Sequence, residues 1–142
     1  MDLTYELPTD LRAIEDFVEK LLVEGRRIGF NPDRLRLNLR VSVTEALSNA
    51  MLYGNRQDPR KRVRIQASFT TREIAIRVTD EGRGFDPRHL PDPTTPANLR
   101  KTRGRGIFLI RHLMDEVNYN DQGNSVEMRL RNGPGGPVAH AS

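Results

Sequence analysis

The chain has 142 residues, of which 36% are hydrophobic and 30% are charged, a balance typical of one globular domain with a single core. It contains no cysteine, which excludes disulfides and thiolate metal sites. The three histidines lack the spacing of metal ligands. No apolar run approaches the roughly 18 residues that span a bilayer, and the N-terminus lacks a signal-peptide pattern. The composition therefore predicts a cytoplasmic domain.

The net charge is +4, and the basic residues gather in two stretches. One is residues 56–64, and the other is residues 98–106, which contain four basic residues and no acid. Either stretch could bind the phosphates of a nucleotide or a nucleic acid. We interpret the first as solvated loop charge, because it connects a helix to a strand and lacks interleaved aromatic residues.

The first elements are predicted from periodicity. Residues 3–7 alternate in polarity and predict a short edge strand that ends at Pro8. Thr9 or Asp10 can cap the helix that follows, and Gly25 and Gly29 mark its fraying end.

A second helix is predicted to begin at Asn31, a good cap before proline. It ends near Tyr53, where Gly54 and Asn55 provide a stop. Its predicted core residues are Leu35, Leu39, Val43, Ala46, Leu47 and Ala50.

The remaining elements follow a change to strand periodicity. Residues 63–69 and 74–78 predict two strands joined by a turn. Between Gly84 and Gly104 lie 19 residues with four prolines, and a loop of this length is usually functional or disordered. A helix from about Gly104 to Met114 and a hairpin over 116–131, turning at residues 122–124, complete the pattern.

This order of elements predicts an α+β fold. We expect a two-layer sandwich in which helices cover one face of a mostly antiparallel, mixed sheet. The folded domain spans residues 1–131. The Gly- and Pro-rich residues 132–142 are predicted to form a flexible tail.

The strand over residues 74–78 leads into Asp80, which is followed by Gly82 and Gly84. Because side chains alternate along a strand, the Asp80 carboxylate is predicted to lie at the end of the buried face. A buried carboxylate requires hydrogen bonds. The residues alone leave two possible hydrogen-bond donors to this carboxylate open: the backbone N–H groups of an Asx-type turn, or an amino group of a ligand.

The second predicted helix carries Glu45 and Asn49, four residues apart and therefore about 40° apart on one face. An Asn carbonyl is a hard oxygen ligand that suits Mg²⁺ bridging phosphates. A carboxylate nearby can take a proton from a hydroxyl that attacks a γ-phosphate. The alternative is a solvent-facing polar pair on an amphipathic helix.

Gly104 and Gly106 precede the apolar helical stretch that starts at Ile107. Glycines there expose backbone N–H groups, and a helix N-terminus favours phosphate. Arg103, Arg105 or Lys101 could add charge-assisted contacts. The alternative is that these glycines simply begin a helix.

Three stretches, in this order and spacing, resemble the GHKL (Bergerat) ATP-binding superfamily. They are "TEALSNAMLYGN", "DEGRGFDP" and "GRGIFLIRHLMDEV", and they are most similar to the bacterial anti-sigma-factor serine/threonine kinases. The resemblance covers about residues 1–131. Tyr53 departs from the histidine that many members carry at the end of the first stretch.

The resemblance implies a role for each matching residue. Asn49 would hold Mg²⁺, Glu45 would be the catalytic general base, and Asp80 would accept the adenine amino group. Residues 85–103 would form the ATP lid. The other residues implied in ATP binding are Gly82, Gly84, Phe85, Arg103, Gly104, Arg105, Gly106 and Ile107.

Members of this branch use ATP and Mg²⁺ to phosphorylate a serine of an anti-anti-sigma (STAS-type) protein, and they also bind a sigma factor, typically as homodimers. The resemblance implies that this chain does the same, as a transcription regulator without direct contact with nucleic acid or membrane.

Three alternatives belong to other functional classes. The chain could be a non-catalytic partner-switching module that depends on ATP or ADP, although the presence of Glu45 favours catalysis. It could be the detached ATP-binding domain of a histidine kinase, but no phosphoacceptor helix precedes the fold and the initial strand and helix fit the anti-sigma branch better. It could bind nucleic acid through residues 56–64, which steeply salt-dependent binding would support.

Overall fold

The computed structural model describes residues 1–82 and 102–133. Its centre is a five-stranded sheet in the order β1-β2-β3-β5-β4. The strands are β1 (Asp2–Pro8), β2 (Arg62–Phe69), β3 (Glu73–Thr79), β4 (Glu116–Tyr119) and β5 (Ser125–Arg131). β1 lies at an edge, as predicted. Each pairing is antiparallel, so no parallel pair occurs among the described strands.

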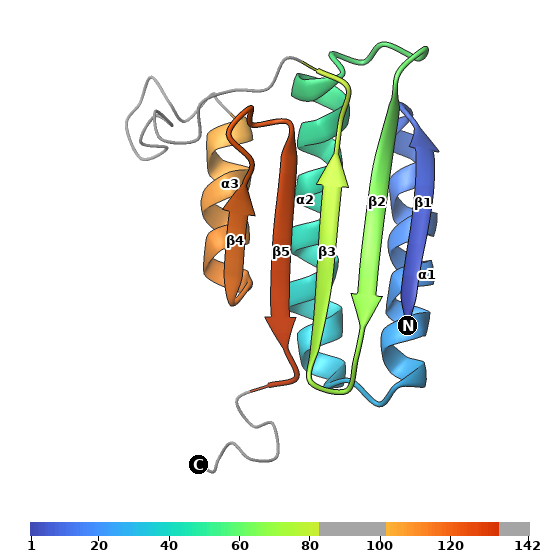
Figure 1. The fold of residues 1–142 in the computed structure, drawn as a ribbon, viewed down its shortest axis with the longest axis vertical. Coiled ribbons are helices and arrows are strands. Elements are labelled where there is room, and N and C mark those ends of the chain that lie inside the picture. The colour runs from blue at the N-terminus through green and yellow to red at the C-terminus, as the bar shows by residue number, and fades with distance from the viewer. Residues whose placement is uncertain (83–101, 134–142) are drawn as a thin grey trace.

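Three helices cover one face of this sheet (Figure 1). They are α1 (Ile14–Arg27), α2 (Arg40–Asn49) and α3 (Thr102–Leu113), and α2 lies between the other two. A short 3-10 turn, η1 (Leu11–Ala13), leads into α1, and Asp10 caps this turn, since its side chain accepts the N–H of Arg12. The predicted α+β two-layer sandwich is confirmed.

Alternation along the strands places the hydrophobic side chains between the sheet and the helices. Ile65, Ile76 and Met128 are fully buried there. The opposite face is charged, and its side chains pair across strands, as Arg129 does with Glu73 at 2.6 Å. Only one face of the sheet is apolar, and the helices cover that face.

The second predicted helix is continuous but not uniform. A wider, π-type segment, η2 (Arg34–Leu39), precedes α2, and another, η3 (Ala50–Gly54), follows it. Asn31 caps its start as predicted, because its Oδ1 accepts the N–H of Asp33 at 2.9 Å. π-type turns often occur at functional sites, and η3 leads into the site described below. The predicted core residues are all buried: Leu35, Leu39, Val43, Ala46, Leu47 and Ala50.

The first helix ends at Arg27, between the two glycines that were predicted to mark its fraying end. Gly25 lies inside α1 and is buried. A Cβ at this position would come within 2.5 Å of Leu35 Cδ2, so the missing side chain lets the next helix approach. Gly29, with a φ of 75°, follows the helix and reverses the chain.

The third helix begins at Thr102 rather than at Gly104. Thr102 and Arg103 both have better helix propensity than glycine, so the helix extends two residues beyond the predicted start. The last two residues of the predicted lid therefore belong to α3, whereas residues 85–101 of the lid lie outside the described residues.

Of the predicted tail, residues 134–142 also lie outside the described residues. Asn132, within the described part, donates from Nδ2 to the Thr71 carbonyl at 2.8 Å and accepts the N–H of Asn31 at 2.7 Å. Among the described helices, none has both the length and the apolar character needed to cross a membrane.

The basic residues of 56–64 lie at the surface, and several have acidic partners. Arg60 contacts both carboxylate oxygens of Asp58, at 3.1 and 3.0 Å, and these hydrogen bonds lower the pKa of Asp58 to about 2. Arg62 and Arg64 contact Glu6 at 3.4 and 3.8 Å. Arg60 with Asp58 fits the interpretation as solvated loop charge, whereas Arg62 and Arg64 lie on β2 and pair across it to β1.

The turn between η3 and β2 contains two consecutive left-handed residues that are not glycine. Arg56 has a φ of 52° and Gln57 a φ of 60°, and the N–H of Asp58 closes the turn on the Asn55 carbonyl at 3.0 Å. Left-handed backbone is unfavourable for L-residues that carry a Cβ. The hydrogen bonds around the turn therefore hold strained backbone in place.

We expect Gln57→Gly to raise the free energy of unfolding by about 1 kcal/mol relative to Gln57→Ala, because glycine adopts positive φ without a Cβ penalty. The two variants lose the same exposed side chain, so Gln57→Ala is the matched control. Thermal unfolding would show a melting temperature about 3 °C higher for the glycine variant. Equal melting temperatures would contradict strain at this turn.

Candidate functional site

The site begins at Asp80, the residue directly after β3. Asp80 is 8% exposed and follows Ile76 and Val78 on the buried face of the strand, as predicted. Its Oδ1 accepts the N–H of Gly82 at 2.7 Å, so the Asx-type turn that the sequence left open is present.

Two glycines form the surroundings of the Asp80 carboxylate. A Cβ at Gly54, the last residue of η3, would lie 2.2 Å from Asp80 Oδ2. A Cβ at Gly82 would lie 2.0 Å from the Gly54 carbonyl oxygen and 2.9 Å from Asp80 Oδ1. Only residues without a side chain fit at these positions, so the end of the second helix packs directly against the carboxylate.

The β4–β5 hairpin fixes the backbone of Asp80 from the other side. The Asp80 N–H donates to the Asn124 carbonyl at 2.9 Å, and Asn124 Nδ2 donates to the Asp80 carbonyl at 3.3 Å. Beside them, the hydroxyls of Thr79 and Ser125 are 2.8 Å apart. The hairpin thus sets the position of the residue that follows β3.

A second group of residues lies where α2 and α3 meet. A Cβ at Gly106 would come within 2.7 Å of Glu45 Oε2 and 3.3 Å of Asn49 Nδ2. Glu45 and Asn49 are both half-buried. The structure therefore brings together three predicted site residues, and the absence of a side chain at Gly106 makes room for the carboxylate and the amide.

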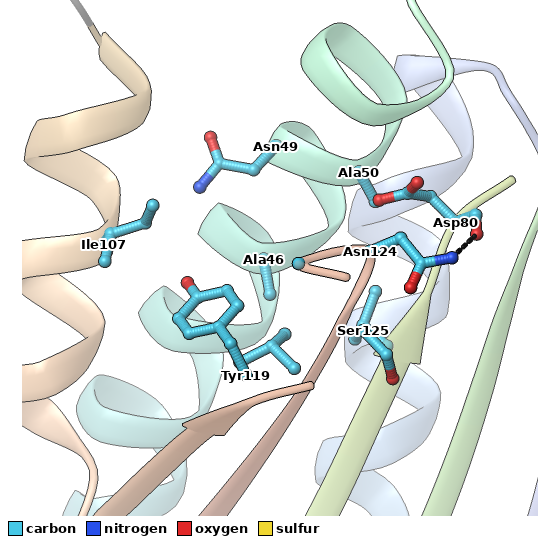
Figure 2. A pocket seen from close by; sticks show the side chains of 11 residues that line it. Ala46, Asn49, Ala50, Asp80, Ile107, Tyr119, Asn124 and Ser125 are labelled. Carbon is cyan, nitrogen blue, oxygen red and sulfur yellow. Dashed lines mark hydrogen bonds between the residues drawn. The ribbon is translucent and has the colours of Figure 1, made fainter. Parts of the chain in front are cut away.

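A cavity of about 30 Å³ connects the two groups. Asn49 and Asp80 both line it, with Ile107 on the α3 side and Tyr119 on β4. In Figure 2 the Asn49 side chain points into the space between α2 and α3, and Asp80 lies beyond it on the β3 side. The predicted acidic residue and the predicted metal ligand thus border one space.

The other predicted residues fall into two sets. Arg105 is exposed on α3, and Arg103 and Gly104 lie in the first turn of the same helix. Gly84 and Phe85 lie outside the described residues. Of the predicted nucleotide-binding residues, the described part of the chain thus places Asn49, Asp80 and Ile107 on the cavity, and Gly82 and Gly106 against its polar side chains.

Sequence reasoning missed three residues of the site. Gly54 was predicted only as a helix stop, and Tyr119 and Asn124 were assigned only to a hairpin. The sequence could have indicated Gly54 as a site residue, because it precedes the polar Asn55 at the end of the helix that carries Glu45 and Asn49. The hairpin residues carried no such signal, since their approach to Asp80 depends on the pairing of β3 with β5.

The donor set at the α2–α3 junction consists of carboxylate and amide oxygens, which suit Mg²⁺. Within residues 1–82 and 102–133, no group of three or more His, Cys, Asp or Glu side chains gathers. Mg²⁺ usually keeps several waters and uses one or two protein ligands beside substrate phosphates. Glu45 and Asn49 therefore fit a Mg²⁺ ion that is held partly by the phosphates of a ligand.

Gly82 and Gly106, two of the glycines that face polar atoms, are expected to respond differently to alanine. Gly82→Ala places a methyl group against the Gly54 backbone, so we expect a loss of about 1–3 kcal/mol and a melting temperature lower by roughly 3–10 °C. Gly106→Ala meets only the ends of two side chains, Glu45 and Asn49, and gains helix propensity. Thermal unfolding should show an unchanged or higher melting temperature, and equal losses in both variants would contradict the close packing of Gly82.

Comparisons with known proteins identify the family of the chain. The profile of the histidine kinase-like ATPase domain matches residues 5–130. The serine-protein kinase RsbW of Oceanobacillus iheyensis is 31% identical over 113 residues, which cover 74% of this chain and 71% of that protein. RsbW of Bacillus subtilis is 30% identical over 109 residues, covering 72% and 68% of the two chains.

A solved structure has the same fold. The crystal structure of the RsbU and RsbW domains of a Mycobacterium tuberculosis protein superposes with a TM-score of 0.62, at 15% identity, and covers 92% of this chain and 32% of that one. On the family match and the RsbW relatives, the chain belongs to the histidine kinase-like ATPase family, in its anti-sigma-factor serine kinase branch.

Proposed function

We propose that this protein binds Mg-ATP and transfers the γ-phosphate to a serine of an anti-anti-sigma, STAS-type protein, and that it also sequesters a sigma factor. The observation that carries the proposal is the cavity that joins Asp80 to the α2–α3 junction. It is bordered at one side by a buried acid and at the other by an amide with a carboxylate one helical turn away.

In this proposal Asp80 recognises the base. Its carboxylate accepts the adenine amino group, and the turn through Gly82 lets the ring approach because no side chain intervenes. Charge-assisted hydrogen bonds of this kind are roughly twice as strong as neutral ones. The packing of Gly54 and Gly82 around the carboxylate restricts its motion, which reduces the entropy lost on binding.

The phosphates are proposed to lie at the α2–α3 junction. The first turn of α3, with Gly104 and Gly106, offers backbone N–H groups and the positive end of the helix dipole. Arg103 and Arg105 are the proposed cationic contacts, and Ile107 packs beside the nucleotide. Asn49 is the proposed magnesium ligand; a bound Mg²⁺ would neutralise charge that develops on the phosphates.

Glu45 is the proposed general base. The serine oxygen attacks the γ-phosphorus, the bond from that phosphorus to the bridging oxygen of ADP breaks, and the serine proton passes to the Glu45 carboxylate. Positioning and charge neutralisation supply most of the acceleration in phosphoryl transfer. The place of Glu45 beside Asn49 and Gly106 supports this role.

The partners and the assembly are proposed from family membership. Several relatives carry the name serine-protein kinase RsbW, and one from Bordetella bronchiseptica, 27% identical over 88 residues, is named serine/threonine-protein kinase BtrW. We propose a homodimer that binds a sigma factor and a STAS-type protein in competition, so that phosphorylation decides which partner is held. The proposed location is the cytoplasm.

A non-catalytic binding module that responds to ATP or ADP is the second candidate. Both functions need the same cavity, so it does not distinguish them. Glu45, the acid at the α2–α3 junction, does. A module that only binds nucleotide has no need for a carboxylate beside the metal ligand, whereas a kinase uses one as a base. Glu45 therefore favours the kinase.

Glu45→Ala is expected to lower phosphoryl transfer by about 10²–10⁴-fold, because a general base contributes acceleration of that size. ATP affinity should change little, since the carboxylate is proposed to contact the attacking hydroxyl rather than the nucleotide. The measurement is transfer of radiolabelled γ-phosphate to STAS-type proteins of the same genome, with Glu45→Gln as the isosteric control. Transfer at the unmodified rate in both variants would refute the role of Glu45.

Asp80→Asn and Asn49→Ala are expected to weaken ATP binding in distinguishable ways. Loss of the carboxylate at position 80 should lower affinity about tenfold or more, with and without Mg²⁺, because a hydrogen bond to a charged group is lost. Loss of the amide at position 49 should lower affinity only when Mg²⁺ is present. Calorimetry with ATP under both conditions measures each effect, and Mg²⁺-independent loss in Asn49→Ala would contradict the metal role.

A further inference from the structure

Asn55 is a fully buried polar residue that the proposed mechanism does not use. Within the described residues, the buried polar or charged side chains are Ser42, Asn55 and Asp80. Asn55 follows η3 and precedes the strained turn at Arg56 and Gln57. A buried carboxamide is costly unless its hydrogen bonds are satisfied, so the partners of this side chain indicate what it holds in place.

Three hydrogen bonds join Asn55 to Glu81 and Arg62 in a closed ring. Asn55 Oδ1 accepts the N–H of Glu81 at 2.7 Å, and Asn55 Nδ2 donates to the Arg62 carbonyl at 3.0 Å. Glu81 Oε2 in turn accepts the N–H of Arg62 at 2.6 Å. One partner of the amide is a donor and the other an acceptor, so only one orientation of the carboxamide satisfies both.

A further bond attaches this ring to the start of the first helix. Asn55 Nδ2 also donates to Thr9 Oγ1 at 2.9 Å, and the Thr9 hydroxyl donates to the Lys61 carbonyl at 2.6 Å. Thr9 therefore stabilises the same network, but on the side away from Asp80. A substitution of Thr9 can therefore serve as a control that lowers stability without releasing the peptide group that follows Asp80.

The bond to Glu81 acts on the peptide group that follows Asp80. The N–H of that peptide donates to Asn55 Oδ1, and its carbonyl oxygen accepts from Asn124 Nδ2. Side chains from two different elements thus hold both sides of one peptide plane. Because the N–H of Asp80 also donates to the Asn124 carbonyl, the peptide groups on both sides of the Asp80 Cα are held, and together they fix the direction of its Cα–Cβ bond.

We propose that Asn55 is a positioning residue for base recognition: it orients the Asp80 carboxylate so that the protein distinguishes a purine with an amino group at position 6 from one without it. The proposal rests on the proposed role of Asp80 in ATP binding. A carboxylate displaced by a fraction of an ångström would still fit beside the ring, but its hydrogen bond to the amino group would weaken as the geometry departs from linear.

The test compares the affinities of ATP and purine riboside triphosphate, which lacks only the 6-amino group. Calorimetry with Mg²⁺ on the unmodified protein, Asn55→Ser and Thr9→Val gives the affinity ratio for each, below the melting temperature of every variant. We expect Asn55→Ser to lower the ratio about tenfold and Thr9→Val to leave it unchanged, although both lower the melting temperature.

Two further variants keep the test decisive if Asn55→Ser does not fold. Asn55→Asp keeps an oxygen acceptor for the Glu81 N–H, so it should retain selectivity while losing stability. Asn124→Ala releases the carbonyl side of the same peptide plane, so it should lose selectivity. A ratio that falls in step with melting temperature across all variants, including Thr9→Val, would mean that Asn55 only stabilises the fold and would overturn the proposal.

The same data separate this inference from the proposed function. If the unmodified protein binds ATP selectively and Asn55→Ser is equally selective, the inference about Asn55 is wrong and the role of Asp80 stands. If the unmodified protein does not bind ATP, or binds both nucleotides equally, the assignment of Asp80 falls and the inference falls with it.

Discussion

The contact between the end of the second helix and the end of β3 is the constraint on which the site depends. Gly54 and Gly82 let two backbone segments close around the Asp80 carboxylate, with a Cβ at either position excluded by atoms within 2.2 Å. A buried acid is tolerated only where such contacts and hydrogen bonds compensate its lost hydration. The polar residue at the end of an apolar strand is therefore held by the fold rather than placed at a free surface.

The second helix supplies both sides of the site. Its central part, α2, carries Glu45 and Asn49 toward Gly106 of α3, and its π-type end, η3, brings Gly54 to the acid. The π-type turns change the rotation of side chains about the axis, and the chain then turns sharply through two left-handed residues. Backbone strain next to a buried network is common at functional sites, and here the network includes the neighbour of Asp80.

The fold and the positions of several candidate site residues could be predicted from the sequence, because both depend on patterns within single elements. Period-2 and period-3.6 hydrophobicity identified the strands and the helices, and the buried stripe from Leu35 to Ala50 was predicted correctly. The helix ends were less accurate. Gly25 was predicted as part of the fraying end of α1, but its close contact with Leu35 was not predicted, since a glycine has no signal that separates a helix end from a close approach.

The sequence by itself determined the sandwich, the placement of Asp80 at the end of a buried face, and the spacing of Glu45 and Asn49 on one side of a helix. Those features follow from periodicity within single elements. Only the tertiary structure decided that Gly106 faces Glu45, that Asn124 and Asn55 hold the two sides of one peptide group, and that Tyr119 borders the cavity. These contacts join residues distant in the chain, and they depend on strand register and helix packing, which no local pattern encodes.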